Sequence, residues 1–123
     1  MKTLAVLLFA LSASGADDGF AKWWPQFQSA VAKGDAKAIT EGSKFPMQWE
    51  LGTVREIKTR EDFVAHFAAH FTADMKRAVA NRKPVAVPEG YMITWKARGN
   101  EYSLYFRPAG GAFALSGLSE GPP

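Results

Sequence analysis

The amino-acid sequence predicts an α+β fold in which helices cover one face of a curved antiparallel sheet. Between Tyr91 and Leu118, three runs alternate apolar and polar residues, a pattern typical of half-buried strands. Upstream, apolar residues recur at helical spacing from Phe20 to Val31 and again from Phe63 to Phe71. A sheet with one apolar face requires a covering layer, and the helices provide it.

The first residues of the chain have the pattern of a secretory signal peptide over Met1–Ala16. Lys2 forms a basic start, Leu4–Leu11 an apolar stretch, and Ser14-Gly15-Ala16 a small-residue cleavage site. The apolar stretch is shorter than the ~20 residues of a membrane-spanning helix. We therefore expect an exported protein, periplasmic or secreted, with no membrane span and with residues 17–123 forming a single domain.

Composition excludes several kinds of site. The chain has no cysteine, so it has no disulfide, thiol nucleophile or zinc–thiolate centre. The formal charge of +3 is slight and falls by one unit without Lys2. Lys76, Arg77, Arg82 and Lys83 cluster near an expected helix end, where they complement the helix dipole. With no nucleic-acid-binding pattern present, we predict no nucleic-acid partner.

The first helix of the mature chain is predicted from five apolar residues on one helical face. They are Phe20, Trp23, Trp24, Phe27 and Val31. Pro25 implies either that the regular helix begins near it or that the helix is kinked there. Gly34 is a natural C-cap, and Asp35 can cap a short second helix that ends near Gly42.

A strand is predicted next. Its inward residues are Phe45, Met47, Trp49 and Leu51. Pro46 suggests that this strand is at a sheet edge or that the residue lies near the strand's beginning. Thr53–Lys58 is expected to return as a shorter second strand.

The next helix is predicted to begin at Thr59-Arg60-Glu61-Asp62, a threonine cap with an acid three residues on. Phe63, Phe67 and Phe71 then recur every four residues, and we expect this helix to be the main cover of the sheet. Thr72 can cap a continuation, which Pro84 ends.

The three C-terminal strands are predicted to form a meander. A turn at Gly99-Asn100 would place Arg98 opposite Glu101, Trp95 opposite Leu104 and Ile93 opposite Phe106. Ala109-Gly110-Gly111 forms the next turn. The predicted order of elements is therefore α-α-β-β-α-α-β-β-β.

This pattern resembles a known superfamily over essentially the whole mature chain. The resemblance is carried by the Trp/Phe-rich first helix, Gly34-Asp35, Lys44-Phe45-Pro46, Thr59-Arg60-Glu61-Asp62-Phe63 and the final meander. Together they resemble small exported bacterial members of the NTF2-like (cystatin-like, cone-shaped) superfamily. The resemblance implies a curved sheet around helices, with a conical cavity open at one end. Members include ketosteroid-isomerase-like enzymes, dehydratases, ligand binders and scaffolding domains, so the fold does not select a function.

Two polar motifs are candidate chemical sites. Asp62, His66, His70 and Asp74 lie four apart, and the two histidines could together ligate a metal. Zinc chemistry requires a third ligand. The sequence shows none nearby, so we predict no metal and no cofactor, with a solvated histidine flank and His70 as a hydrogen-bond donor at a pocket rim. Gly117-Leu118-Ser119-Glu120-Gly121 matches a nucleophile elbow in spacing, but the chain ends at Pro122-Pro123 with no following helix, so we reject that motif.

The aromatic residues favour binding over catalysis. Seven residues are predicted to line an apolar cavity with a few polar tips, namely Trp49, Phe67, His70, Phe71, Tyr91, Trp95 and Tyr102. The same rings could instead fill the core. We therefore expect a non-catalytic module that binds a small apolar ligand or a protein partner.

Two alternatives remain open. The first is a ketosteroid-isomerase- or dehydratase-like enzyme that uses an inward carboxylate, Glu56, with Tyr91 or Tyr102. That alternative fails if Glu56 points to solvent. The second is an interaction domain with a filled core, which would form a homodimer through its sheet.

Overall fold

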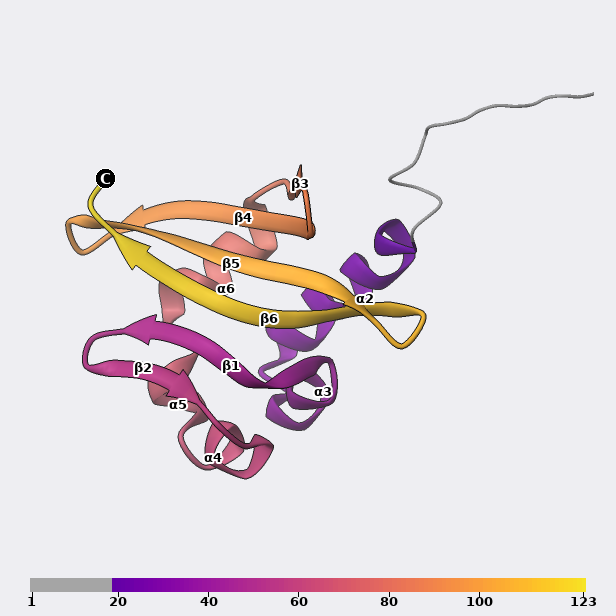
Figure 1. Ribbon diagram of the computed structural model, residues 1–123, viewed down its shortest axis with the longest axis horizontal. Helices are drawn as coiled ribbons and strands as arrows, with labels where there is room; N and C mark the ends of the chain where they lie inside the picture. The colour runs from indigo at the N-terminus through magenta and orange to yellow at the C-terminus, as the bar shows by residue number, and fades with distance from the viewer. Residues whose placement is uncertain (1–18) are drawn as a thin grey trace, which may run out of the picture.

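The computed structural model describes residues 19–123, which form an α+β fold built on a six-stranded mixed sheet (Figure 1). The strand order is β2-β1-β6-β5-β4-β3; β1 and β6 run parallel, and the other neighbours are antiparallel. In Figure 1, α2 and α6 pass behind the strands, so the apolar side chains of the sheet are enclosed between strands and helices. The strands are β1 Ser43–Leu51, β2 Val54–Ile57, β3 Val85–Val87, β4 Gly90–Ala97, β5 Asn100–Ala109 and β6 Ala112–Gly121, and the helices are α2 Phe20–Lys33, α3 Ala36–Glu41, α4 Arg60–Ala65, α5 Phe67–His70 and α6 Ala73–Asn81.

The first predicted helix is confirmed as α2, and four of its five expected apolar residues are buried, whereas Trp23 is half-buried. The helix begins at Phe20 and runs through Pro25, so the alternative that it starts near the proline is wrong. The first turn is held by packing, because the Phe20 ring stacks on Tyr91 with ring centroids 3.9 Å apart. This burial outweighs the preference of Trp24, the residue before a proline, for extended geometry. The predicted signal peptide lies outside the described residues.

The predicted caps at the end of α2 and at the start of α3 are confirmed. Gly34 ends α2 in the left-handed conformation at φ 68°, and the Asp35 carboxylate accepts a hydrogen bond from the Ala38 backbone at the start of α3. Strand β1 alternates as predicted, but Pro46 does not mark a sheet edge, because β1 lies between β2 and β6. Pro46 lies instead where the β1–β6 pairing is irregular, between Ser43 and Gln48, so its missing N–H donor falls in an interrupted part of the ladder.

The predicted single helix with three phenylalanines is interrupted. Thr59 caps α4 and Thr72 caps α6 as expected, but His66, at φ −118°, separates α4 from α5. Phe63 and Phe71 are buried, whereas Phe67 is half-buried. The expectation that this stretch is the main cover of the sheet is therefore wrong, since α6 packs on α2 and β4 while α4 packs on α3 and β2.

The meander is confirmed in its faces and corrected in its register. Trp95 lies opposite Tyr102 rather than Leu104, because the turn residues are Arg98 and Gly99, at φ 53° and φ 79°. Two successive residues with positive φ match the favoured two-residue hairpin turn. The register differs by two residues, so every side chain keeps its predicted face.

Two elements were not predicted, namely the additional short helix α5 and the strand β3. Strand β3 lies between Pro84 and Pro88 and pairs with the first part of β4 (Val85 opposite Met92). The observed order thus contains one helix and one strand more than predicted.

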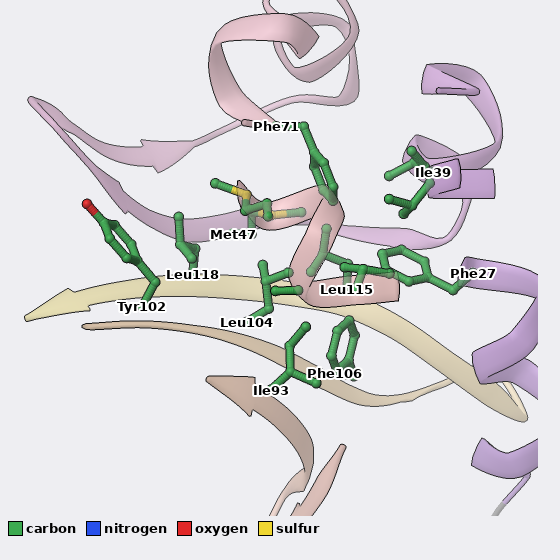
Figure 2. Close-up of a cluster of buried hydrophobic side chains, with 14 of the residues drawn as sticks. Phe27, Ile39, Met47, Phe71, Ile93, Tyr102, Leu104, Phe106, Leu115 and Leu118 are labelled. Carbon is green, nitrogen blue, oxygen red and sulfur yellow. The ribbon is translucent and has the colours of Figure 1, made fainter. Parts of the chain in front are cut away.

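Strand β6 is longer than predicted and carries a bulge. Phe106 pairs with Leu115 while Tyr105 pairs with Gly117, so Ser116 is the extra residue. As a result Leu115 and Leu118, which have opposite parity, both enter the core beside Leu104 (Figure 2). A Cβ at Gly117 would lie 2.9 Å from the Gln48 carbonyl oxygen, so glycine allows β1 to approach here.

Candidate functional site

The seven predicted lining residues lie in three different places. Trp49, Phe67, His70 and Phe71 gather around Phe63 at the α4–α5 end of the core. Trp95 and Tyr102 stack on each other with centroids 5.8 Å apart, and Tyr91 stacks on Phe20. Four of the seven are large apolar rings with almost no exposure, Trp49 at 0%, Phe71 at 2%, Trp95 at 4% and Tyr102 at 1%. Their main role is therefore to fill the core.

The Phe63 cluster consists of Phe63, Trp49, Phe67, His70 and Phe71. The Phe63 ring meets Trp49 edge-on at 5.8 Å and lies parallel to the His70 ring at 6.1 Å. Two polar atoms in this cluster, Trp49 Nε1 and His70 Nε2, are buried without a hydrogen-bond partner among the described residues. Burial lowers the pKa of His70 and outweighs the opposing effect of the Asp62 carboxylate.

The two histidines differ in exposure. The His66 side chain is 62% exposed, as a solvated flank requires, whereas only 7% of His70 is exposed. His66 Nδ1 lies 3.2 Å from Asp62 Oδ1, and His70 Nε2 lies 3.8 Å from Asp62 Oδ2. The second distance is too long for a hydrogen bond. His70 is thus inside the structure rather than a donor at a pocket rim.

The Trp95–Tyr102 pair is different, because both of its polar atoms have partners. Trp95 Nε1 donates to Asp74 Oδ2 at 2.9 Å, and Tyr102 donates to Glu120 Oε2 at 2.7 Å. Arg98 also pairs with Asp74 and lies over the Tyr102 ring, 4.7 Å from its centroid. Figure 2 shows the Tyr102 hydroxyl at the margin of the apolar cluster, pointing away from it.

Both carboxylates have lowered pKa values. Burial alone would raise the pKa of Asp74, but the hydrogen bonds from Trp95 and Arg98 outweigh it. The Tyr102 hydroxyl is the main cause of the lowered pKa of Glu120. Glu120 was missed in the sequence, where it belonged only to the rejected Gly117–Gly121 motif. The signal that could have found it is the β5–β6 register, which sets it opposite Tyr102.

A cleft of about 610 Å³ lies between α6 and β4. It is lined by Asp74, Arg77, Ala78, Asn81, Arg82, Trp95, Lys96 and Ala97. Arg77, Arg82 and Lys96 are exposed, and none of them takes part in an ion pair found within residues 19–123. Arg77 lies within α6 rather than at its end, so it does not have the dipole-complementing place expected from the sequence. Of the seven predicted lining residues, Trp95 is the one that borders this cleft.

The catalytic candidates are not brought together. Glu56 is exposed on β2, the edge strand, and pairs with Gln48 of β1. Its carboxylate therefore does not enter the core beside Tyr91 or Tyr102, both of which belong to the β4–β5 hairpin. Ser119, the serine of the rejected nucleophile motif, lies within β6, and its hydroxyl is 3.0 Å from the Tyr105 hydroxyl.

The solvent-facing side of the sheet carries a row of hydroxyls. Thr94 and Ser103 are in hydrogen-bond contact across β4 and β5 at 3.0 Å, next to the Tyr105–Ser119 pair. This face is polar, and its members are half-buried.

Comparison with known proteins adds no family. No family model, no curated protein and no solved structure matches the chain. Among the helices of residues 19–123, none combines the length and the apolar character needed to cross a membrane.

Proposed function

We propose that this protein is an exported, non-catalytic binding module of the NTF2-like type. Its ligand is a small molecule that carries both negative charge and apolar surface, and its binding site is the cleft between α6 and β4. The observation that carries the proposal is the combination in one cleft of a buried tryptophan and three exposed cations that form no ion pair with another described residue. Its volume of about 610 Å³ lies within the ~300–1,000 Å³ usual for ligand sites.

The charges of the cleft favour an anion. Asp74 is the lining carboxylate, and Arg98 and Trp95 already satisfy its two oxygens. Arg77, Arg82 and Lys96 line the same cleft, and none of them is in an ion pair among the described residues. Arginine side chains suit carboxylate and phosphate groups because they offer paired N–H donors.

The apolar part of the ligand is expected to lie against Trp95, Ala78 and Ala97. The outer edge of β4 is also open here, because β3 pairs with β4 only as far as Met92. Backbone groups along an unpaired strand edge can bind a polar part of a ligand. The site differs from the apolar cone interior expected from the sequence, because it lies between α6 and β4 and, of the predicted lining residues, Trp95 borders it.

The NTF2-like assignment rests on the order of elements, with two helices before a strand pair and a final meander over a helical layer. The enzyme alternative loses its carboxylate, because Glu56 is exposed on β2 and does not face the core. Pairing of two copies through the sheet stays a prediction from the sequence. Export rests on the signal-peptide pattern alone.

The test uses a fluorescent probe with the proposed chemistry, 8-anilinonaphthalene-1-sulfonate, which is anionic and aromatic. We expect saturable binding of one probe per chain, weakened by salt. The double change Arg77→Ala and Arg82→Ala should weaken binding by about tenfold or more, because a charge-assisted hydrogen bond contributes about 1.5–3 kcal/mol.

The matched control is the double change Lys33→Ala and Lys37→Ala, which removes the same charge from exposed positions outside the cleft. Circular dichroism must show native packing throughout, since loosened cores also bind this dye. Equal loss of binding in both double variants, or no loss in either, would contradict the proposal. Native mass spectrometry of protein purified from its own periplasm or medium would then identify the natural ligand class.

A further inference from the structure

We propose that Asp62, His66 and His70 form a binding site for one divalent cation of the zinc class. The site uses residues outside the α6–β4 cleft, and the inference does not depend on the proposed ligand. One ligand atom from each of the three side chains lies within 4.8 Å of the other two. Two imidazole nitrogens and a carboxylate oxygen are a ligand set that zinc takes readily.

The interruption of the helix creates this cluster. In one continuous α-helix, residues eight apart are separated by about 12 Å along the axis, so Asp62 and His70 could not share an ion through short side chains. Here His66 breaks the helix at φ −118°. His70 Nε2 is consequently 3.8 Å from Asp62 Oδ2, with His66 Nδ1 3.2 Å from the other oxygen of that carboxylate.

These separations are close to what an ion requires. Ligand atoms at ~2.1 Å from a tetrahedral zinc lie about 3.4 Å from one another. The observed distances of 3.2 and 3.8 Å run to different oxygens of Asp62, and the three ligand atoms lie within 4.8 Å of one another, so side-chain rotations would be needed to bring all three to that spacing. The third ligand, which the sequence analysis did not find, is Asp62.

A second, independent observation concerns His70 Nε2. This atom is buried and has no hydrogen-bond partner within residues 19–123, and it faces the Asp62 carboxylate at a distance too long for a hydrogen bond. Buried polar atoms nearly always have a partner, so an orphan indicates a missing water or ion. The parallel Phe63 ring, 6.1 Å away, limits how far the imidazole can turn to find another partner.

The alternative is an ordinary surface pair between Asp62 and His66, four residues apart on one helix. That pair explains His66, which is 62% exposed, but it leaves the buried Nε2 of His70 without a hydrogen-bond partner among the described residues. The exposure of His66 and of Asp62, whose side chain is 46% exposed, gives an ion a path from solvent. Three protein ligands would leave a coordination position for water or for an anionic ligand.

The test is titration of the purified chain, without a histidine tag, with Zn²⁺ by calorimetry and with Co²⁺ by visible absorption. We expect one ion per chain, a d–d spectrum of low-coordinate cobalt, and a rise in unfolding temperature with Zn²⁺. Asp62→Asn and His66→Ala should each weaken binding by at least about tenfold, because loss of even an outer-shell partner costs 10–100-fold.

The control is Glu61→Gln, which removes a neighbouring exposed carboxylate outside the cluster and should leave binding unchanged. Asp62 and His66 are tested rather than His70 because their side chains are exposed, so their variants should still fold. Absence of saturable binding to the wild-type chain would overturn the proposal. So would binding that survives both substitutions, or that Glu61→Gln weakens equally.

Discussion

Two buried tryptophans of the same sheet differ in whether the indole nitrogen has a hydrogen-bond partner. Trp49 of β1 and Trp95 of β4 are both inward-facing, 0% and 4% exposed. The Trp95 indole donates to Asp74, whose second oxygen pairs with Arg98. The Trp49 indole nitrogen has no partner among the described residues, and neither has His70 Nε2 in the same cluster.

The difference shows at which end of the core the buried polar atoms have hydrogen-bond partners within the described residues. At the β4–α6 end, both polar groups of the Trp95–Tyr102 pair are satisfied by side chains, and the proposed ligand would bind beside them in the cleft. At the α4–α5 end, two unsatisfied atoms sit within one aromatic cluster, which costs stability unless something else binds. The proposed cation accounts for one of these two atoms. The structure offers no account of the Trp49 indole.

The largest expected effect comes from Trp49→Ala. The side chain is fully buried against Phe63 and Phe71, so truncation should lower the free energy of unfolding by about 3–5 kcal/mol. Urea denaturation measures this loss. A stable Trp49→Ala protein with impaired ligand binding would instead show that Trp49 lines a cavity, as the sequence alone allowed.

The next effect separates the two indoles. Trp95→Phe removes a hydrogen bond to a carboxylate, worth about 1.5–3 kcal/mol, in addition to the lost packing. Trp49→Phe removes a similar volume and no hydrogen bond, so its cost should be smaller. The measurement is the difference between the two unfolding free energies under one set of conditions. Equal costs would mean that the Trp95–Asp74 bond contributes little net stability.

The smallest effect is the acid dependence of that bond. The pKa of Asp74 in the folded protein lies below the ordinary value of 3.8. The stability that the Asp74 carboxylate contributes is therefore fully present above pH 3.8 and is lost as the pH falls through the folded-state pKa. Unfolding curves measured from neutral pH to below pH 3.8 should show a smaller acid-induced loss of stability for Asp74→Asn than for the wild type. A conservative Asp35→Asn change serves as the control, because Asp35 only caps α3. If Asp74→Asn follows the wild-type curve, Asp74 is not the group that titrates.

The sequence predicted the elements correctly where apolar alternation or a capping residue marked them. The alternation of Tyr91–Trp95 and of Tyr102–Phe106 placed the correct side chains inside, even though the predicted turn was displaced by one residue. The threonine caps at Thr59 and Thr72 were found because the side-chain acceptor and the helix start are neighbours in the chain. Strand β3 was missed, because three residues between two prolines carry too little periodicity.

By itself, then, the sequence determined the α+β class, the inward faces of the strands and the N-terminal caps of three helices, because each depends on residues within a turn or two of one another. Only the tertiary structure decided the break at His66, the bulge at Ser116 and the central place of β1. It also decided that Asp62 meets His70, that Glu120 meets Tyr102 and that Asp74 reaches Trp95. These contacts depend on packing between distant segments, which periodicity along one segment cannot report.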